Sequence, residues 1–224
     1  MKYSAIVTDI EGTTSRISFV TEVLFPYAAR ELPAFIHARQ HDPDVADQLQ
    51  ACRQLMQQSD ASIEQISQQL LQWIAADEKV TPLKALQGMV WQHGYQTGAF
   101  TGHVYDDVVR QLQHWHSQGV KLYVYSSGSV QAQQLLFQYS DAGDLTPLFS
   151  GYFDTRIGAK RDISSYAAIL QQLQLPPKQV LFLSDVTAEL DAAAQLGIDT
   201  VQLIREGQPA TKHKTATDFY QIAE

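Results

Sequence analysis

The sequence predicts a doubly wound α/β fold, in which helices cover both faces of a mostly parallel β-sheet, with an all-α domain inserted. Four short runs rich in β-branched and aromatic residues are typical of strands buried on both faces. These runs are residues 3–8, 120–125, 179–183 and 200–204. Three of them end in a polar turn followed by a helical pattern, and a long helical stretch separates the first run from the second.

The composition excludes several classes of protein. The chain has 224 residues and a formal net charge of −8, without any cluster of Lys and Arg, so it is not expected to bind nucleic acid. It has neither a signal-peptide pattern nor a run of about 18 apolar residues, which argues against a membrane protein. The single cysteine, Cys52, is expected in the core and forms no internal disulfide. A cytoplasmic protein is predicted.

Helical periodicity precedes both the second and the third predicted strand. Val108, Leu112 and Trp115 recur at helical spacing, and Gly119 stands where such a helix would end. Residues 169–173 repeat the pattern before a pair of prolines. These segments are predicted to be helices that cross over the sheet.

Residues 16–104 are predicted to form the helical insertion, with residues 1–15 and 105–224 forming the catalytic core. Apolar stripes indicate one helix through Val45 and Leu49 and another through residues 63–74, while Thr81 and Pro82 resemble the N-cap and first position of a third. The Gly-rich stretch 93–102 is predicted to be a hinge. An insertion beside an active-site loop suits a lid, although a purely structural subdomain is the alternative.

Polar residues follow three of the predicted strands at their carboxyl ends, where open parallel sheets bind ligands. The first strand is followed by Asp9 and Glu11, the second by Ser126 to Ser129, and the third by Asp185 and Glu189. Acidic side chains gathered at one edge repel one another unless a cation lies among them. Carboxylate oxygens suit Mg²⁺, which also accepts a phosphate oxygen of a substrate. A metal ion and a phosphate group are therefore the expected occupants.

A positive side chain is expected beside this phosphate. Lys160 follows a glycine and precedes a predicted helix, but its neighbour Arg161 competes with it, and the pattern does not choose between them. Taken singly, each acid, serine or lysine is also typical of a cap, a turn or a solvated surface. Their order along successive strand ends favours a functional site.

The motifs Asp9-Ile10-Glu11-Gly12-Thr13-Thr14, Ser126, Lys160 and Asp185 with Glu189 resemble, in this order, the haloacid dehalogenase superfamily of Mg²⁺-dependent phosphatases. The resemblance covers essentially the whole chain and implies a Rossmann-like core with an inserted helical cap. Most phosphatases of the superfamily have Asp at the second acidic position, where this chain has Glu11. With the motifs 125–133 and 183–187, the chain looks similar to the bifunctional enolase-phosphatases of methionine salvage.

This resemblance implies the roles of the site residues. Asp9 would be the nucleophile that forms an aspartyl phosphate, and Glu11 the general acid and base. Phosphate would be bound by Ser126, the Ser127 amide and Lys160. The resemblance also implies that Mg²⁺ would be held by Asp9, the main-chain carbonyl of Glu11 and Asp185. Glu189 would support the water ligands of the metal or Lys160.

The resemblance also implies the substrate, the small phosphate ester 2,3-diketo-5-methylthiopentyl-1-phosphate. It would be enolised and then dephosphorylated to the acireductone 1,2-dihydroxy-3-keto-5-methylthiopentene, with Glu11 or Lys160 as the enolisation base. A monomer is expected. The main alternative is a related phosphatase of another small phosphate ester without enolase activity. A hydrolytic dehalogenase and a non-catalytic phosphometabolite-binding protein are further alternatives.

Overall fold

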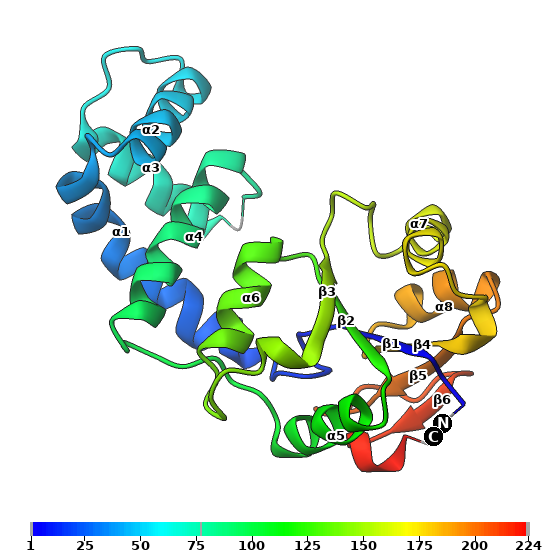
Figure 1. Cartoon of the computed structure of the whole chain (residues 1–224). Coiled ribbons are helices and arrows are strands. Elements are labelled where there is room, and N and C mark those ends of the chain that lie inside the picture. Colours follow the sequence, from blue (N-terminus) through cyan, green and yellow to red (C-terminus); the bar gives the residue numbers. More distant parts are fainter. Residues whose placement is uncertain (1, 77, 223–224) are drawn as a thin grey trace. The chain divides into compact units, whose positions relative to one another are not determined.

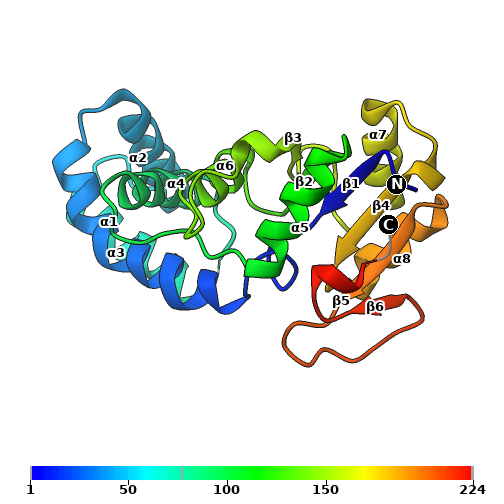
Figure 2. The same cartoon turned by 60° about the horizontal axis from the view of Figure 1, so that its bottom comes forward.

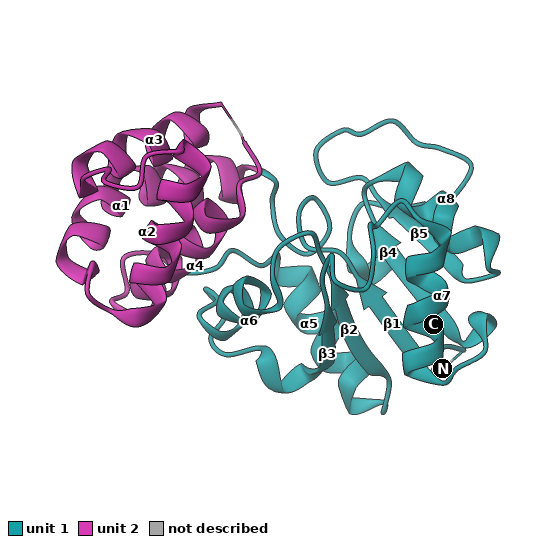
Figure 3. Ribbon diagram, turned by 90° about the horizontal axis from the view of Figure 1, so that it is seen from above, with its two compact units in different colours: residues 1–17, 101–224 teal, residues 18–100 magenta. Residues whose placement is uncertain are grey.

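The computed structural model describes residues 2–76 and 78–222, which form two compact units. The first unit comprises residues 1–17 and 101–224, and the second comprises residues 18–100 (Figure 3). The chain enters the second unit soon after the first strand and returns from it before the second strand (Figure 1).

The first unit contains a six-stranded sheet with the order β3-β2-β1-β4-β5-β6, in which every neighbouring pair is parallel. The strands are β1 (Ala5–Thr8), β2 (Lys121–Tyr125), β3 (Phe149–Phe153), β4 (Val180–Ser184), β5 (Asp199–Leu203) and β6 (Lys214–Ala216). The chain winds outward from β1 through β2 to β3, then returns to continue in the other direction from β4. The winding therefore reverses beside β1, which lies between β2 and β4.

Helices lie on both faces of this sheet (Figure 3). They are α5 (Asp106–Ser117) and α6 (Val130–Gln138) on one side, and α7 (Ile163–Leu173) and α8 (Thr187–Gln195) on the other. Short helical turns occur at Thr146–Leu148, Pro177–Gln179 and Phe219–Gln221. The prediction of a doubly wound α/β fold is confirmed.

Two strands were not expected from the sequence. The run of β3, Phe-Ser-Gly-Tyr-Phe, has three aromatic residues, but the glycine at its centre weakens the strand signal and the apolar run is interrupted. Strand β6 has only three residues and lies at the edge of the sheet, after the long loop that follows β5 (Figure 2). Both strands depend on pairing with a neighbour already present.

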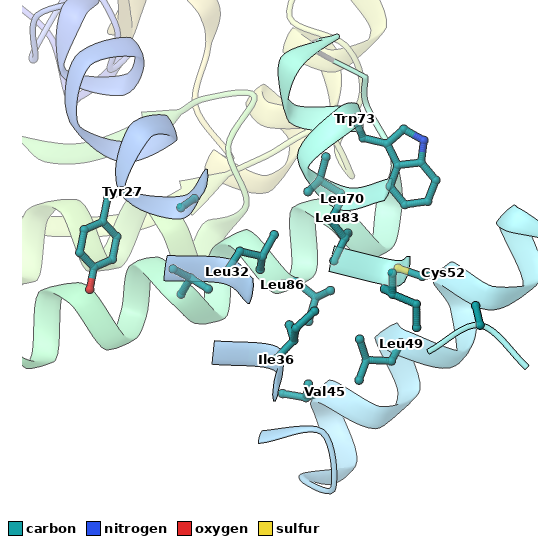
Figure 4. Packing of buried hydrophobic residues seen from close by; sticks show 14 residues of the cluster. Tyr27, Leu32, Ile36, Val45, Leu49, Cys52, Leu70, Trp73, Leu83 and Leu86 are labelled. Atoms are coloured by element: carbon teal, nitrogen blue, oxygen red, sulfur yellow. The ribbon is translucent and has the colours of Figure 1, made fainter. Parts of the chain in front are cut away.

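The second unit consists of helices. Its elements are a π-helix (Val20–Leu24) that continues into α1 (Phe25–Arg39), then α2 (Pro43–Met56), α3 (Ile63–Ala75) and α4 (Thr81–Gln96). Their apolar faces form one core, in which Leu32, Leu49, Leu70 and Leu86 are almost fully buried (Figure 4). Cys52 is part of this core, as expected, and burial raises the pKa of its thiol to about 11.

The sequence analysis was wrong about details of this unit. Helix α1, which contains Pro26 and Pro33, was not foreseen, since two prolines interrupt its apolar pattern. Helix α4 begins one residue earlier than predicted, because Val80 is the N-cap and Thr81 already lies in the helix. The predicted hinge at 93–102 is helical up to Gln96. Within the described residues no helix combines the length and apolarity that a membrane span requires.

A buried ion pair joins α5 to the segment beyond β5. Arg205 donates to both carboxylate oxygens of Asp107, at 3.1 and 2.7 Å, and its guanidinium lies over the rings of Tyr105 and Phe219. Asp107 also accepts a hydrogen bond from the Phe219 main-chain amide at 2.7 Å. The two side chains are only 5% and 14% exposed, so each charge depends on the other for its solvation.

Replacing one partner of this pair should be costly. In Asp107→Ala the guanidinium stays buried without its carboxylate, and we expect the free energy of unfolding to fall by about 3–5 kcal/mol. The control is Lys178→Ala, which breaks the exposed pair with Asp199 and should cost less than about 1 kcal/mol. Urea unfolding followed by circular dichroism measures both, and equal losses in the two variants would contradict the prediction.

Candidate functional site

Asp9 lies at the point of the sheet where the winding reverses. The last residue of β1, Thr8, is in register with Val124 of β2 on one side and Leu183 of β4 on the other. The Asp9 amide continues the ladder by donating to the Leu183 carbonyl at 2.9 Å. Asp9 therefore emerges, 5% exposed, between the carboxyl ends of two neighbouring strands, the usual place for a ligand in such folds.

A tight turn follows Asp9. The amides of Thr13, Thr14 and Ser15 all donate to the carbonyl of Ile10, at 3.2, 2.9 and 2.9 Å. Gly12 makes the turn possible with a φ of +71°, which residues with a side chain rarely adopt. The turn leaves Glu11 at the surface beside the buried Asp9.

Lys160 connects two of the predicted acids. Its Nζ lies 2.6 Å from Asp9 Oδ1 and 2.7 Å from Glu189 Oε2, and all three side chains are more than 90% buried. Burial alone would lower the pKa of Lys160, but the two carboxylates raise it by more than burial lowers it. The pKa is therefore raised overall, and the amine is charged. Arg161, the alternative from the sequence, is exposed.

Glu189 is held from a second side. The hydroxyl of Ser184, the last residue of β4, donates to Glu189 Oε2 at 2.9 Å and accepts from the Val186 amide at 3.0 Å. Burial and the negative charge of Asp9 raise the pKa of Glu189, while Lys160 opposes them. Glu189, in the first turn of α8, thus anchors the far side of the Lys160 ammonium.

Asp185 lies next to the turn at Gly12. A Cβ atom added to Gly12 would come within 2.5 Å of Asp185 Oδ2, so only glycine leaves room for this carboxylate. Its Oδ1 atom is buried without a hydrogen-bond partner among the described residues, and Gln208 contacts Oδ2 at 3.5 Å. Burial and the nearby Asp9 raise the pKa of Asp185 to about 6.

The site contains more negative than positive charge. Burial, and then Asp9, raise the pKa of Glu11, although the residue reaches the surface. Lys160 is the cation that counteracts these shifts at Glu11, Asp185 and Glu189. In the described part of the chain no group of three or more His, Cys, Asp and Glu side chains could hold a metal ion. Two carboxylates and a main-chain carbonyl, however, suffice for an ion that retains water ligands.

The two predicted serines follow β2. Ser126 is buried, its amide donates to the Phe153 carbonyl at 3.2 Å, and its hydroxyl accepts from the Gly128 amide at 3.1 Å. Ser127 is exposed. Because β2 is paired in register with β1, Ser126 leaves the sheet beside the segment that carries Asp9.

The sequence analysis missed the contribution of the loop after β5. Arg205 donates through Nε to the Thr13 carbonyl at 3.2 Å, and Glu206 accepts from the Ile17 amide at 3.2 Å. With Gln208 at Asp185, this loop braces both the turn and the acid opposite it. The position of Arg205 could have indicated this contribution, because Arg205 directly follows the fourth predicted strand just as Asp9 follows the first.

The sequence matches the family model of haloacid dehalogenase-like hydrolases over residues 3–197. It is 55% identical to a protein of Pseudomonas syringae named enolase-phosphatase E1, over 99% of this chain and 98% of that one. A protein of Hahella chejuensis with the same name is 58% identical, over 90% of this chain and 86% of that one.

A solved structure extends the comparison. The crystal structure of the UTR4 protein of Saccharomyces cerevisiae matches 98% of this chain and 100% of its own, with a TM-score of 0.84 and 36% sequence identity. The resemblance that the motifs indicated is confirmed by the sequence similarity. The chain belongs to the haloacid dehalogenase-like hydrolases and, within them, to the family of the enolase-phosphatases.

Proposed function

We propose that the protein is an enolase-phosphatase that converts 2,3-diketo-5-methylthiopentyl-1-phosphate into 1,2-dihydroxy-3-keto-5-methylthiopentene and phosphate, in L-methionine salvage. The observation that carries this proposal is the 55% identity to an enolase-phosphatase over nearly the full length of both chains. The groups at the carboxyl ends of the strands are those that the chemistry requires.

In this proposal Asp9 is the nucleophile. Its carboxylate attacks phosphorus in line, forming an aspartyl phosphate as the bond to the ester oxygen breaks, and water then hydrolyses the acyl phosphate. The 2.6 Å contact with the Lys160 ammonium supports this role, because it holds the attacking Oδ1 atom beside a fixed positive charge. Glu189 holds the ammonium from the other side and so acts on the site through Lys160.

Glu11 is proposed to protonate the leaving oxygen and afterwards to accept a proton from the attacking water. A general acid works best when its pKa lies near the working pH, and the raised pKa of Glu11 supports this role. The Ser126 hydroxyl, the Ser127 amide and Lys160 are proposed to bind the phosphate. Such a site neutralises the phosphoryl oxygens with hydrogen bonds and one fixed charge.

The residues of the site fit a Mg²⁺ ion. Asp9, Asp185 and the main-chain carbonyl of Glu11 would hold it. The buried Oδ1 atom of Asp185, which has no hydrogen-bond partner among the described residues, supports this assignment. Bound there, Mg²⁺ would offset the excess negative charge and withdraw electrons from the phosphoryl and carbonyl oxygens of the substrate.

The residues 18–100 are proposed to be a cap that covers the substrate and selects its methylthio tail. Of the two bases expected from the sequence, Glu11 is proposed as the enolisation base, because the charged Lys160 ammonium has no lone pair with which to accept a proton. We also propose that the protein works as a cytoplasmic monomer.

The proposal is tested by an anaerobic ultraviolet time course with the diketo phosphate, together with an assay of phosphate release. We expect an enol absorbance and phosphate from the wild type with Mg²⁺, and no phosphate from Asp9→Asn or after chelation of the metal, because the attacking carboxylate or the compensating charge is lost. Phosphate released from other esters, but neither enol nor phosphate from this diketone, would instead indicate a phosphatase without enolase activity.

The enolisation base is identified by exchange in deuterium oxide. Glu11→Gln removes the proton acceptor but keeps the size of the side chain, so we expect deuterium incorporation at the enolised carbon to fall at least about 100-fold, the scale of general-base catalysis. Nuclear magnetic resonance of the recovered substrate measures this. Undiminished exchange would exclude Glu11 as the enolisation base.

Gly12→Ala tests the metal assignment. The added methyl group would meet Asp185 Oδ2, so we expect the Mg²⁺ concentration for half-maximal activity to rise about 10-fold, equivalent to about 1.4 kcal/mol of lost binding. Gly143→Ala is the matched control, because it has a similar φ of +89° with nothing within 4 Å of the new atom. Calorimetric titration with Mg²⁺ gives the same comparison without turnover. Equal Mg²⁺ affinities in both variants would contradict the assignment.

A further inference from the structure

Three consecutive main-chain carbonyls around Lys160 each accept a hydrogen bond from a different side-chain hydroxyl. The pairs are Tyr125 to Gly158 at 2.9 Å, Ser165 to Ala159 at 2.7 Å and Tyr166 to Lys160 at 2.7 Å. These hydroxyls come from the end of β2 and the first turns of α7. A loop that forms no helix or strand is thus tied to the sheet on one side and to a helix on the other.

The three donors are among the most buried polar side chains of the unit. Tyr125 and Ser165 are completely buried, and Tyr166 is 1% exposed. The Tyr166 ring packs edge-on against Tyr125 and Phe182, with centroids 5.7 and 5.1 Å apart. Close packing leaves these rings little freedom, so their hydroxyls have defined positions. A buried hydroxyl without a hydrogen bond is destabilising, and here the loop carbonyls are the partners.

The loop is also held by close approach to α7. Gly158 has a φ of +134°, and a Cβ atom at this position would overlap Ser165 Oγ. The backbone therefore runs directly against the helix, at a distance that only glycine permits. The hydroxyl of Ser165 is oriented at this contact toward the next carbonyl, that of Ala159.

This arrangement bears on the position of the Lys160 ammonium. A lysine side chain has a flexible four-carbon stem, so its charged end is only as well placed as its main chain allows. Lys160 Nζ must lie between Asp9 and Glu189, at 2.6 and 2.7 Å, although it comes from a loop rather than a strand. The ammonium also lies over the Tyr125 ring, with Nζ 5.8 Å from the ring centroid.

We infer that Tyr125, Ser165 and Tyr166 are positioning residues, whose hydroxyls fix the main chain of residues 158–160 and thereby the Lys160 ammonium beside Asp9. The inference rests on the proposed function, in which Lys160 neutralises the phosphoryl group and the nucleophile. Loss of one hydroxyl should misplace the ammonium without removing it. Such small displacements of a catalytic group lower turnover more than they lower binding.

The test is Tyr166→Phe, which removes the hydroxyl and keeps the ring. With p-nitrophenyl phosphate as substrate we expect kcat to fall about 10-fold, from one lost hydrogen bond and the resulting misplacement, with little change in KM. Tyr3→Phe is the matched control, since it also loses a hydrogen bond, to Asp199 at 3.0 Å, but at the other end of the sheet. It should keep the wild-type kcat. Ser165→Ala should behave as Tyr166→Phe does.

A second comparison separates positioning from a general loss of stability. In a Lys160→Ala background, Tyr166→Phe should cause no further decrease in kcat, because the group that it positions is gone. The inference would be overturned if Tyr166→Phe lowered kcat by the same factor in the Lys160→Ala background as in the wild type. It would also be overturned if Tyr166→Phe lowered only the Tm and kept the kcat of Tyr3→Phe. The aryl ester keeps this outcome separate from the substrate assignment, since a wild type that cleaves the ester and does not enolise the diketone contradicts only the proposed function.

Discussion

The site depends on one buried ammonium, that of Lys160, held between two carboxylates. A charged amine at this depth would be strongly destabilising by itself, and Asp9 and Glu189 replace the water that it loses. The three residues come from the end of β1, a loop before α7 and the first turn of α8. Unless these elements are assembled in their native arrangement, the charges remain unpaired. The fold and the electrostatics of the site therefore depend on each other.

The strand order explains how these distant segments meet. Because β1 lies between β2 and β4, its carboxyl end has Ser126 on one side and Ser184 with Asp185 on the other. The loop after β5 adds Arg205, which reaches the Thr13 carbonyl, and Gln208, which reaches Asp185. The turn at Gly12 is thus held both by its own amides, which donate to the Ile10 carbonyl, and by Arg205 from the loop after β5.

Sequence reasoning predicted most of the sheet because four strands, β1, β2, β4 and β5, have strong local signals, and their predicted bounds differ from the observed ones by one or two residues. It missed β3, whose apolar run is interrupted by a central serine and glycine, and β6, which has only three residues; both become strands by pairing with a neighbour. It missed α1 because Pro26 and Pro33 interrupt the apolar pattern, although both are compatible with the helix that forms. Elements specified by tertiary contacts leave little trace in a local pattern.

The same distinction holds within the site. Asp9, Ser126 and Asp185 could be proposed from strand ends alone, because the geometry of a parallel sheet brings those ends together. Lys160 could not be chosen over Arg161, since a loop without regular structure does not reveal which of two neighbours points inward. The orientation of this loop is set by the buried hydroxyls of Tyr125, Ser165 and Tyr166, which donate hydrogen bonds to three consecutive loop carbonyls. Because tyrosine and serine at these positions have the same local signal as ordinary core residues, their contribution becomes visible only when the helix and the loop are seen together. The least predictable part of the site is thus the part whose position is set by side chains that belong to the core.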